Sequence, residues 1–328
     1  MMRIEDGTEM FYGCVHLEVF TPFVSSLVTG NRMFADCRKL RDFNQDLTNL
    51  TTASEMFINC TNLRTWNNET NKLKTANSMF YRSGIDNFYL YESEKVNPLN
   101  LPKLETGTQM FYECKNLKYL YGHMANLNDG VDMFYGCSSL MNFYSKLSNL
   151  KDGTRMFAGD TSLTFFSSYH FDEKPELEKL TNGTGMFYGC YNLSSFYATL
   201  PALETGDEMF YGCTSFGTND LIYHENDFAK LKSANHMFYD CVRLKKFNYK
   251  TPLLTKSDSM FYGCVHLVEI GHDGNNGSGN VNVQLRSDFS SVVDGKMMFK
   301  NCYNLVNFYS DLSSLSTANE MFTGCYEL

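Results

Sequence analysis

The eleven cysteines are the residues of this sequence with the most versatile chemistry. A thiolate can ligate zinc, attack an electrophilic carbon or form a disulfide with a second cysteine. Each cysteine lies four residues after the Met of a Met-Phe dipeptide, and neighbouring cysteines are at least 23 residues apart. Zinc sites use closely spaced pairs such as Cys-x-x-Cys, and cysteines in stacked repeats have parallel Cβ directions that oppose disulfides. We therefore predict a ladder of buried, reduced thiols that fill space and donate to loop carbonyls, with no metal and no cofactor.

Two polar segments combine histidine with acidic residues. Tyr169 and His170 precede Asp172, and Tyr223 and His224 precede Glu225. A metal site shared by the two segments is one interpretation. Solvated polar loops are the more ordinary one.

The sequence contains none of the motifs that mark common enzyme classes. It has no Gly-x-Ser-x-Gly nucleophile turn, no phosphate-binding loop and no dinucleotide fingerprint. Eleven cysteines in equivalent positions do not single out one nucleophile. The sequence favours a protein that is not an enzyme.

Composition excludes two further classes of partner. The chain has 37 acidic and 28 basic residues, a formal net charge of −9 and no Lys/Arg-rich block, so we expect no nucleic-acid binding. No apolar run reaches the roughly 18 residues of a membrane span, so we expect no membrane insertion. The start MMRIEDGTEMF lacks the apolar region of a secretory signal.

A fixed period organises the whole chain. Met-Phe occurs thirteen times, and eight of the twelve intervals between successive copies are 23 residues long. The other intervals are 31, 30, 28 and 38 residues. Self-similarity at a period of this size predicts a repeat architecture of about thirteen coils.

The residues around each Met-Phe predict a short turn. Counting the Met as position 0, position −3 is always Gly, Ala or Ser, position −2 is mostly a helix N-cap type, and position +3 is mostly Gly, Asn or Asp. Small residues allow close packing, and Gly, Asn and Asp tolerate the left-handed conformation that ends a helix. We predict one helical or 3₁₀ turn per coil, with Met and Phe inward and position +2, often Tyr, outside.

A short strand is expected after this turn. Position +7 is Leu in eleven copies, and an aromatic residue usually follows at +10. A single 23-residue coil has no second layer against which to bury this apolar stripe. Stacking the coils about 4.8 Å apart turns each position into a continuous buried ladder.

The frame Leu-x-x-(Gly/Ala)-x-x-Met-Phe-x-Gly-Cys-x-x-Leu-x-x-Phe resembles the BspA-like leucine-rich repeats of bacterial and protist surface proteins. The resemblance covers essentially the whole chain. It implies an α/β repeat fold, a right-handed leucine-rich-repeat solenoid with a concave parallel β-sheet. It also implies adhesion or binding and an extracellular or cell-surface location.

We expect residues 1–328 to form a single solenoid that is uncapped at both ends, which would allow end-to-end contacts or contacts in a larger assembly. The extra residues of the four long intervals fall between the strand and the Leu at −6. The predicted insertions therefore leave one edge of the solenoid, near residues 89–102, 167–176, 218–228 and 271–286. Loops gathered on one edge are common binding sites in repeat proteins.

Positions +9 and +11 flank the inward strand residue and are expected to face the concave surface, where Tyr and Asn predominate. Exposed Tyr is a typical anchor of binding surfaces, and cross-strand Tyr pairs also stabilise sheets, so both roles stay open. The candidate partner-binding residues on this face are Tyr119, Tyr121, Asn142, Tyr144, Phe165, Tyr197, Asn307 and Tyr309. Those in the insertions are Tyr91, Tyr169, His170, Tyr223 and His224.

The sequence thus predicts a non-enzymatic scaffold that recognises a protein or glycan through the concave Tyr/Asn face and the edge loops. The alternative is a structural or receptor-binding component of a larger particle, such as a bacteriophage tail or fibre.

Overall fold

The computed structural model describes residues 3–66, 68–86, 99–166, 177–217, 227–271 and 287–328. The chain divides into two compact units, Met1–Leu177 and Glu178–Leu328, which are described separately. The regular elements of the described residues are short β-strands. Every strand pairing described within a unit is parallel. Each unit is therefore a parallel β-solenoid with little helix in its described residues.

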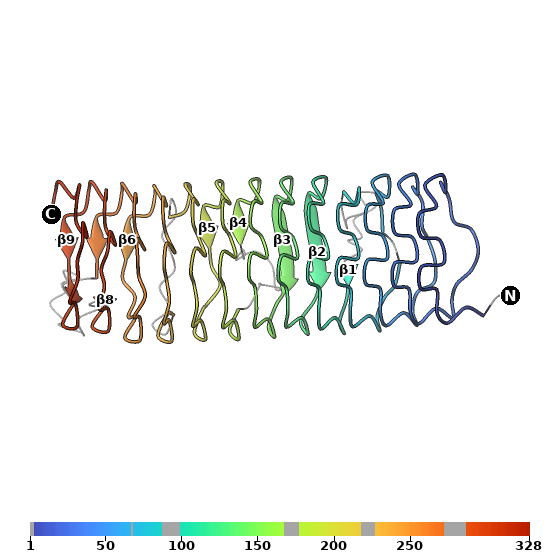
Figure 1. The fold of residues 1–328 in the computed structure, drawn as a ribbon, viewed down its shortest axis with the longest axis horizontal. Helices are drawn as coiled ribbons and strands as arrows, with labels where there is room; N and C mark the ends of the chain where they lie inside the picture. The colour runs from blue at the N-terminus through green and yellow to red at the C-terminus, as the bar shows by residue number, and fades with distance from the viewer. Residues whose placement is uncertain (1–2, 67, 87–98, 167–176, 218–226, 272–286) are drawn as a thin grey trace, which may run out of the picture. The chain divides into compact units, whose positions relative to one another are not determined.

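Four strands of the first unit form one sheet, in the order in which they occur in the chain (Figure 1). They are β1 (Leu99–Asn100), β2 (Tyr119–His123), β3 (Asn142–Lys146) and β4 (Phe165–Phe166). Residues at equivalent positions of successive repeats pair with each other, as Leu120 does with Phe143. The repeat period therefore sets the register of the sheet.

The strands of the second unit are shorter. They are β5 (Ser195–Phe196), β6 (Lys246–Phe247), β7 (Glu269–Ile270), β8 (Ser287–Asp288), β9 (Asn307–Phe308) and β10 (Ser310–Asp311). Strands β6, β7 and β9 form one sheet, and β8 pairs with β10. In both units, single-residue parallel bridges also join the residues four positions before each Met, for example Thr29 with Thr52 and Thr205 with Ser233.

The predicted helical turn at Met-Phe is not confirmed: among the described residues this segment consists of hydrogen-bonded turns. Arg32 at −1 and Asp36 at +3 have φ of 53° and 60°, and helices require negative φ at every residue. The left-handed conformation predicted at +3 is confirmed. Position −1 has the same conformation, and successive backbone N–H groups therefore donate alternately within a coil and to the next coil. The Met33 N–H donates to the Gly30 carbonyl of its own coil (3.2 Å), and the Phe34 N–H donates to the Met56 carbonyl of the next coil (3.0 Å). The α part of the predicted α/β class is therefore not confirmed either.

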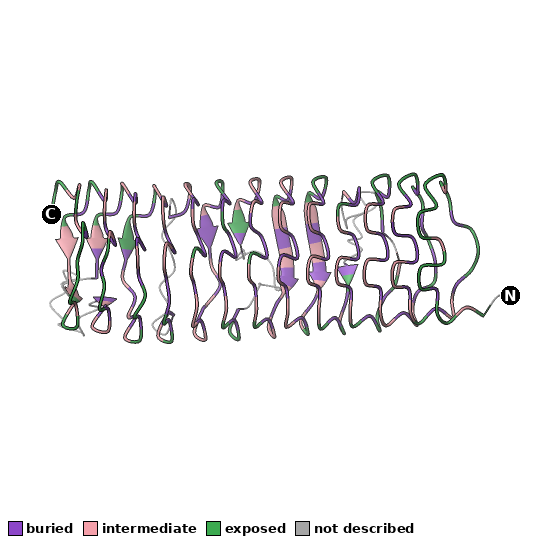
Figure 2. Cartoon of the chain, in the orientation of Figure 1, coloured by how far each residue is buried: buried purple, intermediate pink, exposed green. Residues whose placement is uncertain are grey.

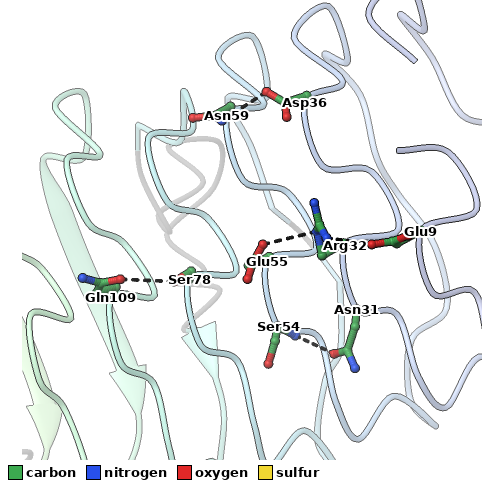
Figure 3. A network of polar contacts seen from close by, with 9 residues as sticks. All are labelled: Glu9, Asn31, Arg32, Asp36, Ser54, Glu55, Asn59, Ser78 and Gln109. Atoms are coloured by element: carbon green, nitrogen blue, oxygen red, sulfur yellow. Dashed lines mark hydrogen bonds and ion pairs between the residues drawn. The ribbon is translucent and has the colours of Figure 1, made fainter. Parts of the chain in front are cut away.

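The side chains at −2 also differ from their predicted role as helix N-caps. Asn31 Oδ1 accepts the backbone N–H of Ser54, the equivalent residue of the next coil, at 2.9 Å (Figure 3). In the same view, Arg32 lies between Glu9 and Glu55 of the two neighbouring coils, with N–O distances of 2.7 and 3.4 Å. Polar side chains in the turns thus link coils to each other.

Met and Phe of the repeated dipeptide point inward, as predicted, and most are fully buried. Phe34 and Phe57 stack with ring centroids 5.5 Å apart, and Phe43 meets both rings edge-on at 4.9–5.1 Å. The small residue at −3 makes room for the Met of the next coil. A Cβ added to Gly130 would lie 3.1 Å from the Met156 sulfur.

The cysteine ladder is confirmed. All eleven cysteines are free thiols, and nine of them are buried. The Cys60 thiol donates to the Phe34 carbonyl at 3.1 Å, and Cys264 donates to the Phe238 carbonyl at 3.0 Å. The thiols therefore fill space and satisfy carbonyl groups of the preceding coil.

A single stack of thirteen coils stays a prediction, as do the right-handed path and the concave curvature. Of the four predicted insertions, the described residues include only 99–102, 227–228 and 271.

Candidate functional site

The longest strands of the first unit carry an alternating surface. Along β2 and β3, every second residue is buried and the residues between are half-exposed, which Figure 2 shows as alternating bands. Leu120 and Phe143 point into the core with 0% and 1% exposure, so their neighbours point outward. We call these neighbours, with Phe165 of β4, the outward sheet face: Tyr119, Tyr121, His123, Asn142, Tyr144, Lys146 and Phe165.

The pairing register arranges the outward sheet face in rows across the strands. Tyr119 pairs with Asn142, which pairs with Phe165 of β4. Tyr121 pairs with Tyr144, and His123 pairs with Lys146. Rows of this kind hold their members on adjacent backbones, so the surface is formed before any ligand arrives.

Aromatic rings dominate the centre of this surface. The rings of Tyr121 and Tyr144 stack with centroids 4.7 Å apart and an interplanar angle of 22°. Burial raises the pKa of the Tyr144 hydroxyl above its ordinary value of 10.0, so it stays a neutral donor at physiological pH. Phe165 exposes 47% of its surface at one side of the face. The Tyr119 hydroxyl donates to the Met141 sulfur at 3.7 Å.

The side chains of this surface offer apolar area and mostly neutral hydrogen-bonding groups, with Lys146 as a cation. Tyr and Phe contribute rigid contact area, while Tyr and Asn contribute donors and acceptors. Among the described residues, no cluster of three or more His, Cys, Asp or Glu side chains is arranged to hold a metal ion. No helix with the length and apolar character of a membrane span occurs in the described part of the chain.

A family model for the BspA type leucine-rich repeat region matches residues 4–99, 85–172 and 178–279. The chain belongs to this BspA-type leucine-rich repeat family. The match covers most of the sequence and agrees with the ladders of Leu, Met-Phe and Cys in the structure.

One solved structure supports the same fold for this BspA-type chain, and a second is more distantly similar. A leucine-rich repeat protein from Bacteroides ovatus is 19% identical, with 98% of this chain and 80% of that chain covered and a TM-score of 0.57. A leucine-rich cell-surface protein from Faecalibacterium prausnitzii is 17% identical over 92% of this chain and 75% of that chain, with a TM-score of 0.38. Comparison with curated protein sequences finds no significant match.

The structure brings together five of the predicted partner-binding residues of this BspA-type chain. They are Tyr119, Tyr121, Asn142, Tyr144 and Phe165, all on the outward sheet face.

Three other predicted residues belong to the second unit. Asn307 begins β9 and pairs with Glu269 of β7, and Tyr309 directly follows β9. Tyr197 directly follows β5, where Ser195, expected on the same face, is only 2% exposed.

The predicted residues of the insertions lie outside the described residues: Tyr91, Tyr169, His170, Tyr223 and His224.

Sequence reasoning missed two members of the outward sheet face, His123 and Lys146. Both lie two residues beyond position +11, because β2 and β3 extend further than expected. The signal was present as an alternation that continues through Tyr119, Tyr121 and His123.

Proposed function

We propose that this chain is a non-enzymatic binding scaffold, secreted or on a cell surface, that recognises a protein or a glycan through the outward sheet face of the first unit. Leucine-rich repeat proteins of this family are generally surface or binding scaffolds, which supports the general role. Adhesion to a host or matrix surface is the specific occupation that we expect. The face contains the first-unit members of the Tyr/Asn surface predicted from the sequence.

One observation carries the proposal: the stacked pair Tyr121–Tyr144, with Asn142 and Phe165 in register beside it. Large aromatic side chains on paired strands are already ordered in the free protein. Binding a ligand therefore costs little additional conformational entropy. Surfaces of this composition commonly contain the residues that dominate binding energy.

The competing role for these tyrosines is stabilisation of the sheet. Cross-strand aromatic pairs contribute about 0.2–1 kcal/mol each, a small part of the stability of a protein of this size. A stabilising role predicts that removing Tyr144 lowers stability without changing recognition. A binding role predicts the reverse.

The experiment uses the complete chain on a glycan array and on a panel of immobilised extracellular-matrix proteins. We expect the wild type to bind members of one panel, Tyr144→Ala to lose at least about tenfold in affinity, and its melting temperature to change little. The matched control is Tyr303→Ala, because Tyr303 is a 39% exposed tyrosine of the second unit. Equal binding by wild type and Tyr144→Ala would contradict the proposal.

A further inference from the structure

The second unit carries a different aromatic surface, built from the tyrosines at position +2 of the turns. Tyr188, Tyr211, Tyr239 and Tyr262 belong to successive repeats and stack one on the next. Their ring centroids are 4.5–4.7 Å apart and the interplanar angles are 1–11°. We call this row the second tyrosine ladder. A ligand that is long and flat can contact several of its ring edges at once.

A second feature lies beside the ladder, at position +3. The repeats of Tyr188 and Tyr211 have Gly189 and Gly212 there, and an added Cβ at either would meet nothing closer than 3.7 Å. The nearest side chain is the ring of Tyr191, which is 53% exposed. Tyr188 is also 42% exposed, so the glycines leave aromatic surface open on this side of the ladder.

The charge beside Tyr211 in the second tyrosine ladder is negative, whereas Lys300 lies 6.0 Å from the centre of the Tyr262 ring at one end of the ladder. Burial is the main reason why the pKa of the Tyr211 hydroxyl is raised, and the carboxylates of Asp240 and Glu208 raise it further. Neither carboxylate forms an ion pair among the described residues. Two uncompensated negative charges beside exposed rings favour a cationic ligand, most strongly at low salt.

The first unit contains a similar ladder whose charges are already neutralised. Tyr81, Tyr112 and Tyr135 stack at 4.7–4.8 Å. At position +3, Arg82 pairs with Glu113 at 2.8 Å, and its guanidinium lies 5.2 Å from the centre of the Tyr81 ring. The chain itself therefore places an organic cation where the first ladder meets its acidic neighbour.

We propose that the second tyrosine ladder, with Tyr191, Glu208 and Asp240, binds flat organic cations. Beside Tyr211, the ligand supplies the positive charge that Arg82 supplies beside Tyr81 in the first unit. Its flat surface covers ring edges that the chain leaves exposed. This site is independent of the outward sheet face and does not rest on the function proposed for it.

The test is a titration of the full chain with thioflavin T, an elongated flat aromatic cation whose fluorescence rises when it is held rigid. We expect saturable binding that weakens with added salt. Tyr211→Ala should weaken it by about tenfold, as removal of a central aromatic contact does. Tyr211→Phe keeps the ring and should bind like the wild type. Glu208→Gln combined with Asp240→Asn should weaken binding and reduce its dependence on salt.

The matched control is Tyr112→Ala, which removes the central ring of the first ladder and should leave the affinity unchanged. Melting temperatures identify any variant that has lost its fold. If Tyr211→Ala does not fold, the binding and salt dependence of the Glu208→Gln, Asp240→Asn variant test the proposal. The proposal is overturned by the absence of saturable binding, by an equal loss in Tyr112→Ala, or by equal affinity for an uncharged analogue of the dye.

Discussion

The two units of this chain have the same core but expose different surfaces. Both have ladders of Leu, Met, Phe and Cys side chains, with thiols that donate to Phe carbonyls at 2.9–3.1 Å. On the sheet face, the first unit presents the neutral pair Tyr121–Tyr144, whereas the second presents Lys246 paired with Glu269 at 3.6 Å. The comparison teaches that the repeat fixes the interior and leaves the exposed positions free to specify different partners.

The tyrosine ladders in the turns show the opposite distribution of ion pairs between the two units. In the first unit, charged side chains pair beside the stacked tyrosines, as Arg82 does with Glu113. In the second unit, glycines and acids without an ion pair among the described residues lie beside Tyr188 and Tyr211, and Lys300 lies over the Tyr262 ring. The two candidate surfaces therefore lie in different elements, in the strands of the first unit and in the turns of the second.

The largest expected effect concerns the cysteines that both units share. Burial raises the pKa of Cys114 from 9.0 to about 12, which lowers its thiolate fraction about a thousandfold at neutral pH. We expect an aromatic disulfide reagent to react quickly with the exposed Cys14 of the native protein and slowly with buried thiols of either unit. In denaturant without reductant, all eleven should react. Far fewer than eleven reactive thiols there would indicate disulfides and refute the free-thiol ladder.

The next effect tests whether the two interiors are equivalent. At Gly130, an added Cβ would lie 3.1 Å from the Met156 sulfur and 3.2 Å from a Leu150 methyl; at Gly183, the distances to Met209 and Leu203 are 3.1 and 3.3 Å. Valine at either site overpacks the ladder, so Gly130→Val and Gly183→Val should each lower the free energy of unfolding by about 1–3 kcal/mol or more. Urea denaturation measures both. A tolerated substitution in one unit only would show that the cores differ.

A smaller effect concerns one position where the cysteine ladder differs between the units. Asp160 replaces Cys in the first unit, is fully buried and has no hydrogen-bond partner for either carboxylate oxygen among the described residues. Burial raises its pKa well above the ordinary 3.8. The folded state therefore holds the proton more tightly than the unfolded state. The free energy of unfolding should fall as pH rises from about 4 toward the folded pKa.

The matched variant is Asp160→Cys, which restores the ladder. At neutral pH it should raise the free energy of unfolding by about 1–3 kcal/mol, the usual penalty of a buried polar group without a partner. The gain should shrink as pH falls from neutral toward about 4 and should stay constant below that, where the carboxyl is neutral in both states. Denaturant titrations at several pH values measure it. A gain that did not vary with pH would mean that the carboxyl is not the cause.

The smallest expected effects are the coupling energies between paired side chains on the sheet of each unit. A double-mutant cycle of Tyr121 and Tyr144 should give a coupling of about 0.5–1 kcal/mol that salt does not change, because ring contacts are not ionic. The same cycle for Lys246 and Glu269 should give about 0–1 kcal/mol and lose most of it in concentrated salt. Chemical denaturation with urea at low and high salt measures both cycles. A salt-dependent coupling in the tyrosine pair would contradict the distinction between the faces.

Much of the fold could be predicted because each interior position repeats. Leu at −6 and +7, Met-Phe and Cys recur at fixed spacing, and repetition of an apolar type indicates a shared buried column. The predicted helical turn was not confirmed, because no residue type marks the positive φ at position −1. Glu, Arg and Gln are found there with positive φ, as at Glu9, Arg32 and Gln109, since a bond to the next coil outweighs the local preference.

The candidate surfaces were predictable in part. Period-2 alternation identified Tyr121 and Tyr144, but it did not show how far β2 and β3 extend, so His123 and Lys146 were missed. The second tyrosine ladder was visible only as recurrent Tyr at +2. The sequence does not show which acids beside a ladder are paired, because the partners belong to different coils. Arg82 and Glu113 of the first unit, for example, are 31 residues apart in sequence.

The amino-acid sequence by itself determined the repeat, the residues that fill the core and the state of the thiols, because identical side chains at one period can be buried only against each other. The tertiary structure decided which exposed residues meet across coils, which charges are neutralised and which rings stay open. Those properties depend on turn conformation and strand length. Bonds between neighbouring coils set both, and no single repeat contains them.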